Sequence, residues 1–264
     1  MSLEPVPPAW RLPQGVNASL WRYAHDPRIA EDEDAFFAGH PLFTTDRDAL
    51  AARFTKPGPL VDLGCGAGRH ALHFAREGFA VTAVELSSAL LGVLGAKAER
   101  EGLRLSRVRA NLCDLGCFPE RSFAYALSMF STLGMIRGRA ARRAALSEAF
   151  RILRPGGRLA LHAHNLWLNL ADSQGRKWLL GQLFQALRHA REIGDRRMTY
   201  RGIPGMEVHL FRWSELRADL RSSGFQIDEV LSIDAVAARP ITVPWLLPRV
   251  RAGGWIVFAR RPES

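Results

Sequence analysis

The stretch Val61-Asp62-Leu63-Gly64-Cys65-Gly66-Ala67-Gly68-Arg69 decides the fold of this chain. The apolar residues 60–63 predict a strand before the glycines, and the pattern over residues 69–77 predicts a helix after them. Glycines at such a junction let the backbone turn tightly and approach a ligand, and the helix N-terminus adds free N–H groups. The sequence therefore predicts a ligand site between a strand and a helix.

The spacing of the glycines and the acidic residues near them indicate the class of ligand. The glycines read G-x-G-x-G rather than the G-x-G-x-x-G of dinucleotide sites, and Asp62 would repel a pyrophosphate but suits an ammonium group. Seventeen residues after Gly68, the second predicted strand ends in Glu85, whose carboxylate can accept hydrogen bonds from ribose hydroxyls. The ligand implied has a ribose, a positive amino group and no phosphate.

The rest of the chain alternates short apolar runs with helical patterns. Strands are predicted at residues 60–63, 80–85, 105–110, 124–128, 158–162, 225–233 and 254–260, with helices at 69–77, 87–101, 139–153 and 213–222. Repeated βα units predict a doubly wound α/β fold with helices on both faces of the sheet. We expect residues 1–54 to form an N-terminal arm and helical lid, and residues 55–264 to form the main domain. Two insertions are predicted in that domain, at about 166–211 (with an irregular hairpin around residues 203–205) and 235–252.

This combination resembles the class I S-adenosylmethionine-dependent methyltransferases of the type 11/25-like group, over about residues 55–165 and with a compatible ending at 213–260. The run Arg151-Ile152-Leu153-Arg154-Pro155-Gly156-Gly157 matches the recurrent "LkPGG" turn of that family, whereas Phe123-Ala124 departs from its common Phe-Asp. The resemblance implies a Rossmann-like seven-stranded sheet in the order 3-2-1-4-5-7-6, with strand 7 antiparallel. It also implies that S-adenosyl-L-methionine is bound by Asp62, Gly64, Cys65, Gly66, Gly68, Glu85, Leu86, Asn111, Leu112, Ser128, Met129 and Phe130.

Candidate catalytic residues follow from the reaction that the resemblance implies. Methyl transfer from a sulfonium is an in-line displacement, so the enzyme mainly supplies proximity, and a base is needed only when the acceptor must lose a proton early. His162, His164 and Asn165 end the fifth predicted strand, on the edge where such sheets bind ligands, and His164 is the preferred base. The alternative is that the two histidines only hydrogen-bond loop backbone. No spacing of His, Cys, Asp or Glu suggests a metal site.

The insertions bear on the methyl acceptor. Both follow strands on the ligand edge, so we expect them to form the acceptor pocket, covered by apolar residues such as Trp167, Trp178 and Trp245. Trp21 and Tyr23 are candidate lid residues over the cofactor. An apolar cover favours a small-molecule acceptor.

Two alternative functions stay open. One is modification of tRNA or another RNA, because Val208-His209-Leu210-Phe211 with Glu215-Leu216 loosely resembles a segment of wobble-uridine tRNA methyltransferases. Phosphates could also meet two arginine-rich patches, Arg137, Arg139, Arg142 and Arg143 in one and Arg196, Arg197 and Arg201 in the other. The second alternative is an NAD-binding Rossmann oxidoreductase.

The composition of the chain bears on its cellular compartment and on its partners. The 264 residues include 36 Lys+Arg against 26 Asp+Glu, a formal net charge of +10, and the excess lies after residue 136. Because 47% of the residues are hydrophobic, the chain can bury a core, which excludes global disorder. Three cysteines without a C-x-x-C motif, no long apolar run and no secretory leader predict a cytoplasmic protein without a membrane partner. The oligomeric state is left open.

Overall fold

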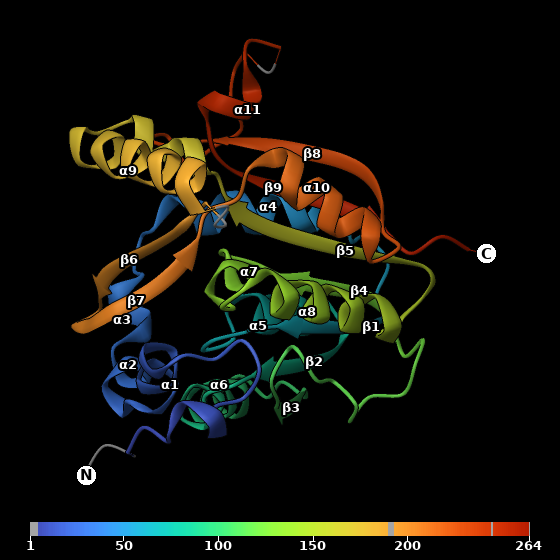
Figure 1. The fold of residues 1–264 in the computed structure, drawn as a ribbon. Coiled ribbons are helices and arrows are strands. Elements are labelled where there is room, and N and C mark those ends of the chain that lie inside the picture. Colours follow the sequence, from blue (N-terminus) through green and yellow to red (C-terminus); the bar gives the residue numbers. More distant parts are fainter. Residues whose placement is uncertain (1–4, 190–192, 244, 264) are drawn as a thin grey trace.

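A computed structural model describes residues 5–189, 193–243 and 245–263, and its centre is one seven-stranded sheet (Figure 1). The strand order is β3-β2-β1-β4-β5-β9-β8, and β9 runs antiparallel to both neighbours. Because β8 and β9 are the sixth and seventh strands of this sheet along the chain, the predicted order is confirmed. The strands are β1 Pro59–Leu63, β2 Ala80–Glu85, β3 Ser106–Arg109, β4 Phe123–Ser128, β5 Leu153–His164, β8 Gln226–Asp234 and β9 Ala252–Arg260.

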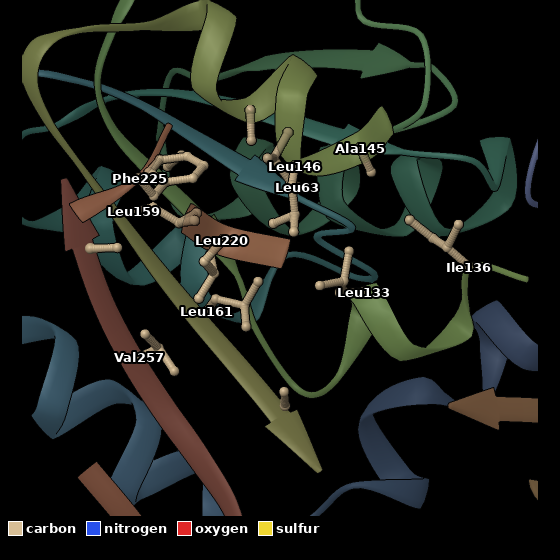
Figure 2. Close-up of a cluster of buried hydrophobic side chains, with 14 of the residues drawn as sticks. Leu63, Leu133, Ile136, Ala145, Leu146, Leu159, Leu161, Leu220, Phe225 and Val257 are labelled. Atoms are coloured by element: carbon tan, nitrogen blue, oxygen red, sulfur yellow. The ribbon is translucent and has the colours of Figure 1, made fainter. Parts of the chain in front are cut away.

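Helices cover both faces of the sheet, and two buried clusters mark them. On one face, α8 (Arg139–Ile152) and α10 (Trp213–Ser222) pack with alternate residues of the strands, such as Leu159 and Leu161. Figure 2 shows side chains of this cluster from both helices and the sheet. On the other face, α4 (Pro41–Ala51), α5 (Arg69–Arg76) and α6 (Ser88–Arg100) pack against residues such as Leu60 and Ala160. Burial on both sides explains why inner strands such as β1 and β9 are mostly apolar, whereas β3 and β8 at the edges of the sheet are more polar and more exposed.

Residues before α4 form short capped helices: η1 Ala9–Arg11, α1 Ala18–His25, α2 Pro27–Glu31 and α3 Glu33–Phe36. Side-chain oxygens of Asn17 and Asp26 accept hydrogen bonds from the first turns of α1 and α2, which explains the break at Asp26-Pro27. Residues 41–54 differ from this segment, because α4 and Phe54 pack on the sheet itself. The division at residue 54 stays a prediction.

The first insertion holds η2 (Leu166–Leu170), α9 (Ser173–His189) and a two-stranded hairpin of β6 (Asp195–Tyr200) and β7 (Ile203–His209). The hairpin turns at Arg201-Gly202, both with positive φ, and not at residues 203–205 as expected. Positive φ at two central residues matches the twist of paired strands. Figure 1 shows the hairpin beside α1–α3, and Ile29 of α2 packs there against Ile203 and Met206 of β7.

The second insertion leads to α11 (Pro248–Arg251), which contacts η2 and β8 at the outer end of the sheet. Ile241 of this insertion is buried, but several of its large apolar side chains are exposed, with Trp245 at 80% and Leu247 at 65%. The remaining short helix, α7 (Thr132–Met135), follows β4. In the part of the chain that the structure describes, no helix is long and apolar enough to cross a membrane.

Candidate active site

A cavity of about 600 Å³ lies beyond the carboxyl ends of β1, β2 and β4. The strand order reverses between β1 and β4, and ligands of such sheets bind at this switch point. The cavity walls come from the glycine loop after β1, the N-terminal helices, the loop after β4 and the β6–β7 hairpin. Segments far apart in the sequence therefore meet around one site.

The three glycines of the loop serve different purposes. All have positive φ, at +79° for Gly64, +54° for Gly66 and +84° for Gly68. A Cβ on Gly64 would lie 2.3 Å from Thr132, and one on Gly68 would lie 2.1 Å from Leu94, so these two glycines allow close packing. Gly64 and Gly66 both line the cavity, and a Cβ on Gly66 would have the Glu33 carboxylate as its nearest neighbour, at 3.3 Å.

Asp62 carries an unpaired carboxylate oxygen. The residue is 2% exposed, and its Oδ2 has no hydrogen-bond partner among the residues that the structure describes. Burial raises the pKa of this carboxyl to about 7. An unpaired buried carboxylate on a cavity wall suits a cationic ligand group, which would offset the cost of its burial.

Glu85 is held rigidly at the end of β2. Its Oε1 accepts hydrogen bonds from Leu86 N (2.7 Å) and Ser87 N (3.0 Å), and its Oε2 accepts one from Gly66 N (3.1 Å). Burial raises the pKa of this carboxyl as well. A carboxylate accepts about four hydrogen bonds, so Glu85 keeps capacity for a ligand hydroxyl.

Most of the other predicted cofactor residues line the same cavity, namely Cys65, Leu86, Asn111, Leu112, Met129 and Phe130. Asn111 is anchored, because its Nδ2 donates to Gln14 O (2.9 Å) and its Oδ1 accepts from Cys113 N (3.1 Å). Gly68 and Ser128 lie outside the lining. Gly68 begins α5, and Ser128 is buried within β4.

Of the three predicted catalytic residues, the structure presents His164 alone to the cavity. Burial lowers the pKa of its imidazole to about 3, so the ring is neutral near pH 7. His162 is 1% exposed, and its Nδ1 lies 3.1 Å from Asp46 Oδ2. Asn165 is fully buried, with Nδ2 donating to Arg249 O and Ala252 O and Oδ1 accepting from Trp167 N. His162 and Asn165 therefore hold neighbouring segments together.

A buried ion pair joins two distant segments at the cavity. Glu33 of α3 forms an ion pair with Arg201 at the hairpin turn, and both side chains are nearly buried. Tyr23 of α1 and Tyr200 of β6 line the cavity beside them, and burial raises the pKa of each phenol. Tyr23 therefore lines the cavity, whereas Trp21 does not, and their role as a lid over the cofactor stays a prediction. Glu33 was not predicted as a site residue, because no local sequence pattern links it to a partner 168 residues away.

An aromatic group forms the side of the cavity around His164. The ring of Phe130 lies edge-on to the rings of Phe37 and His40, with both centroids at 5.4 Å. The Arg69 guanidinium lies 3.2 Å from the ring centroid of Phe43. Arginine on aromatic faces is a favourable arrangement in a partly dry site.

The two insertions contribute unequally to this side. The first supplies six lining residues, Leu168, Arg196, Met198, Tyr200, Val208 and Leu210. The described residues of the second insertion, 235–243 and 245–252, supply none, in contrast to the expectation for residues 235–252, because α11 packs on η2 and β8 rather than over β1 and β4. Trp167 and Trp178 also lie outside the lining.

The arginine patch at 137–143 is neutralised by carboxylates. Arg139 Nη2 lies 2.9 Å from Asp219, and Arg137 Nε lies 3.5 Å from Glu207. Arg142 is fully buried, 3.5 Å from Glu215. Within residues 5–189, 193–243 and 245–263, no group of acidic, histidine and cysteine side chains could hold a metal ion.

Comparison with known proteins identifies part of the chain. Residues 60–157 match the methyltransferase domain family. A curated protein of Geobacillus sp. (strain WCH70) that is named as a methyltransferase is 30% identical over 108 residues, which is 41% of this chain and 43% of that protein. The chain therefore aligns with less than half the length of this relative.

Two solved structures are similar in fold. A SAM-dependent methyltransferase of Methanosarcina mazei has a TM-score of 0.66 at 21% identity, covering 81% of this chain and 98% of that one. The 1,6-didemethyltoxoflavin-N1-methyltransferase of Burkholderia thailandensis, solved with 1,6-didemethyltoxoflavin and S-adenosylhomocysteine, has a TM-score of 0.62 at 19% identity, covering 89% and 84%. At these identities, the likeness describes the fold.

Proposed function

We propose, for a chain whose residues 60–157 form a methyltransferase domain of the class I fold, that its cavity binds S-adenosylmethionine and transfers the methyl group to a small molecule. One observation carries the proposal. A single cavity joins the buried Asp62 carboxylate, whose Oδ2 has no hydrogen-bond partner among the described residues, and the fixed Glu85 carboxylate to an aromatic wall around His164. The first part suits an ammonium and a ribose, and the second suits an apolar acceptor.

The residues present fit the cofactor. Asp62 would meet its ammonium group and Glu85 its ribose, while the open side of Gly66 lets the backbone approach. Asn111 and Leu112 would border the adenine. When bound, S-adenosylmethionine supplies a methyl group that is already activated on a sulfonium.

The chain's own task is then to orient the acceptor and exclude water. The rings of Phe37, Phe130 and Tyr200 give the acceptor flat apolar walls. The neutral His164 imidazole can donate or accept a hydrogen bond, but its pKa of about 3 makes it a weak base near pH 7. We therefore assign His164 the role of orienting the acceptor atom, with any proton lost late or to water.

A small acceptor is favoured over RNA because the arginines of the 137–143 patch are engaged by carboxylates. Three free cysteines, two of them buried, are compatible with a reducing compartment such as the cytoplasm.

Calorimetry with S-adenosylhomocysteine tests the cofactor assignment. Gly66→Val should abolish binding, because a side chain there enters the cavity and meets Glu33. Glu85→Gln should weaken binding about tenfold, as expected for a lost hydrogen bond to a charged group. Unchanged affinity in both variants, or tighter binding of NAD than of S-adenosylhomocysteine, would overturn the assignment.

The acceptor class needs a second assay. Wild-type protein is incubated with labelled S-adenosylmethionine and either total tRNA or a small-metabolite extract. We expect label in the small-molecule fraction. Label that appears only in RNA would refute the small-molecule acceptor while leaving the cofactor assignment intact.

A further inference from the structure

Among the described residues, Arg196 is one of two arginines on the cavity wall, with Arg69. Along β6, alternate residues Arg196, Met198 and Tyr200 line the cavity, whereas Arg197 lies on the outer side, 71% exposed and paired with Glu207 at 2.5 Å. Arg196 has no carboxylate within ion-pair distance among the residues that the structure describes. Its Nη1 donates a hydrogen bond to the Asn169 side-chain oxygen, a neutral acceptor.

Asn169 is built to hold that guanidinium. It is fully buried, and its Nδ2 donates to Leu166 O at 2.8 Å, which fixes the amide orientation. Gly175 packs so closely that a Cβ there would lie 2.3 Å from Asn169 O. The carbon centre of the guanidinium also lies 5.8 Å from the Trp178 ring centroid. Arg196 is thus positioned without being neutralised.

An uncompensated charge on an apolar wall is unfavourable until an anion reaches it. With Nη1 engaged, the guanidinium keeps Nε and Nη2, whose parallel N–H groups match the two oxygens of a carboxylate. The surrounding lining from the same insertion is apolar, with Met198, Val208 and Leu210.

The other arginine that the described residues place on the cavity wall is Arg69. It begins α5 directly after the glycine loop, and its guanidinium lies 3.2 Å from the ring centroid of Phe43 and 5.2 Å from that of Phe37. Arg196 belongs to the added hairpin, where a neutral amide holds it. Because Arg69 is engaged by aromatic faces, Arg196 is the cation that we assign to a second ligand.

We propose that Arg196, held by Asn169, is a carboxylate-binding subsite, so that the methyl acceptor is an aromatic or apolar molecule bearing a carboxylate. This inference rests on the proposed function, because it assigns the second ligand of the same cavity. It makes Arg196 a specificity-determining residue and Asn169 a positioning residue.

The test compares two probes that differ only in charge, 2-naphthoate and 2-naphthamide, by calorimetry on protein saturated with S-adenosylhomocysteine. Wild-type protein should bind 2-naphthoate at least tenfold more tightly than 2-naphthamide. Arg196→Gln should weaken 2-naphthoate about tenfold or more and change 2-naphthamide less than twofold, since hydrogen bonds to a charged group are lost. Arg197→Gln, the adjacent arginine on the outer face, is the matched control and should change neither.

A second variant leaves the arginine in place. Asn169→Asp puts a carboxylate beside Arg196, so it should weaken 2-naphthoate as Arg196→Gln does. The inference is overturned if Arg196→Gln weakens the binding of 2-naphthoate and 2-naphthamide equally. It is also overturned if wild-type protein binds the two probes with the same affinity, or binds neither. The affinity for S-adenosylhomocysteine, measured on each variant, should stay unchanged. Wild-type protein that does not bind S-adenosylhomocysteine would instead refute the proposed function.

Discussion

Asp62 shows how burial can prepare one side chain for a ligand. Its carboxylate lacks one hydrogen-bond partner among the described residues, and burial raises its pKa to about 7. A folded protein normally pairs such a group, and an unpaired one is typical of functional sites. The carboxyl is therefore partly protonated near neutral pH until a cation arrives.

This predicts pH-dependent cofactor binding. An ammonium beside Asp62 favours the ionised carboxylate, so binding releases a proton at pH values below about 7. The affinity for S-adenosylhomocysteine should rise between pH 5.5 and 7, by up to about tenfold per pH unit. Calorimetry at several pH values checks this, and Asp62→Asn should bind more weakly and without that slope. A wild-type affinity that is flat over this range would contradict the prediction.

Single residues also show where sequence reasoning stops. Asp62, Gly66 and Glu85 could be predicted because their spacing in one βα unit reflects a local requirement of the ligand. Glu33 and Arg201 could not, because their contact depends on how the lid folds over the sheet. The same holds for His162, whose partner Asp46 lies 116 residues away.

At the scale of elements, one histidine fastens the hairpin to the domain. His209 at the end of β7 meets Asp195 of β6 at 2.7 Å and Glu215 of α10 at 2.9 Å, with Arg142 of α8 beside them. Burial by itself lowers the pKa of His209, but the hydrogen bonds to the two carboxylates outweigh it and raise the pKa. The histidine and glutamate that suggested an RNA enzyme thus have a structural role in this fold.

The hairpin should therefore loosen at high pH. Because the folded pKa of His209 is raised, its stabilisation is fully present below about pH 6.5 and is lost as pH rises through the folded value. The pKa values of Asp195 and Glu215 are lowered, so their contribution is lost only as pH falls below about 4. Amide exchange of β6 and β7, corrected for intrinsic rates, should accelerate between pH 6.5 and 9 relative to β4.

His209→Gln is the control for this prediction. It should destabilise the hairpin by about 1 to 2 kcal/mol, since buried Glu215 and half-exposed Asp195 lose charged hydrogen bonds while Arg142 stays beside them, and it should remove the alkaline dependence. A variant that keeps the wild-type pH profile would show that another group is responsible.

Elements differ in how far sequence predicts them. Each strand of the main sheet lies within a few residues of its predicted place, because the buried inner strands have a strong apolar pattern and the edge strands lie between recognisable helices and turns. The strand order followed from the family resemblance. The hairpin turn was misplaced because Pro204-Gly205 looks like a turn, yet the chain reverses at Arg201-Gly202. The loop after β8 is apolar, but apolarity alone does not specify which surface it contacts.

At the scale of the whole molecule, the net charge of +10 no longer favours an RNA partner. Many arginines of the second half are in ion pairs, and two of them, Arg142 and Arg201, are buried. Arg196 on the cavity wall has no such pair among the described residues, and its charge lies beside apolar lining residues. The charge thus points less to a polyanionic partner than to a small anion at one position.

The arrangement of lid and sheet predicts which segments a cofactor should protect. Ala30 of α2 packs with Ala67 and Leu90 over the glycine loop, and Tyr23, Glu33 and Tyr200 line the cavity. Saturating S-adenosylhomocysteine should therefore slow amide exchange, followed by mass spectrometry, in residues 18–36 and 195–209 as well as in 62–70. Residues 173–184 and 245–251 serve as an internal control, because neither segment lines the cavity, and their exchange should stay unchanged. Protection confined to the glycine loop would mean that the N-terminal helices do not cover the cofactor, whereas uniform slowing would indicate global stabilisation rather than closure of a lid.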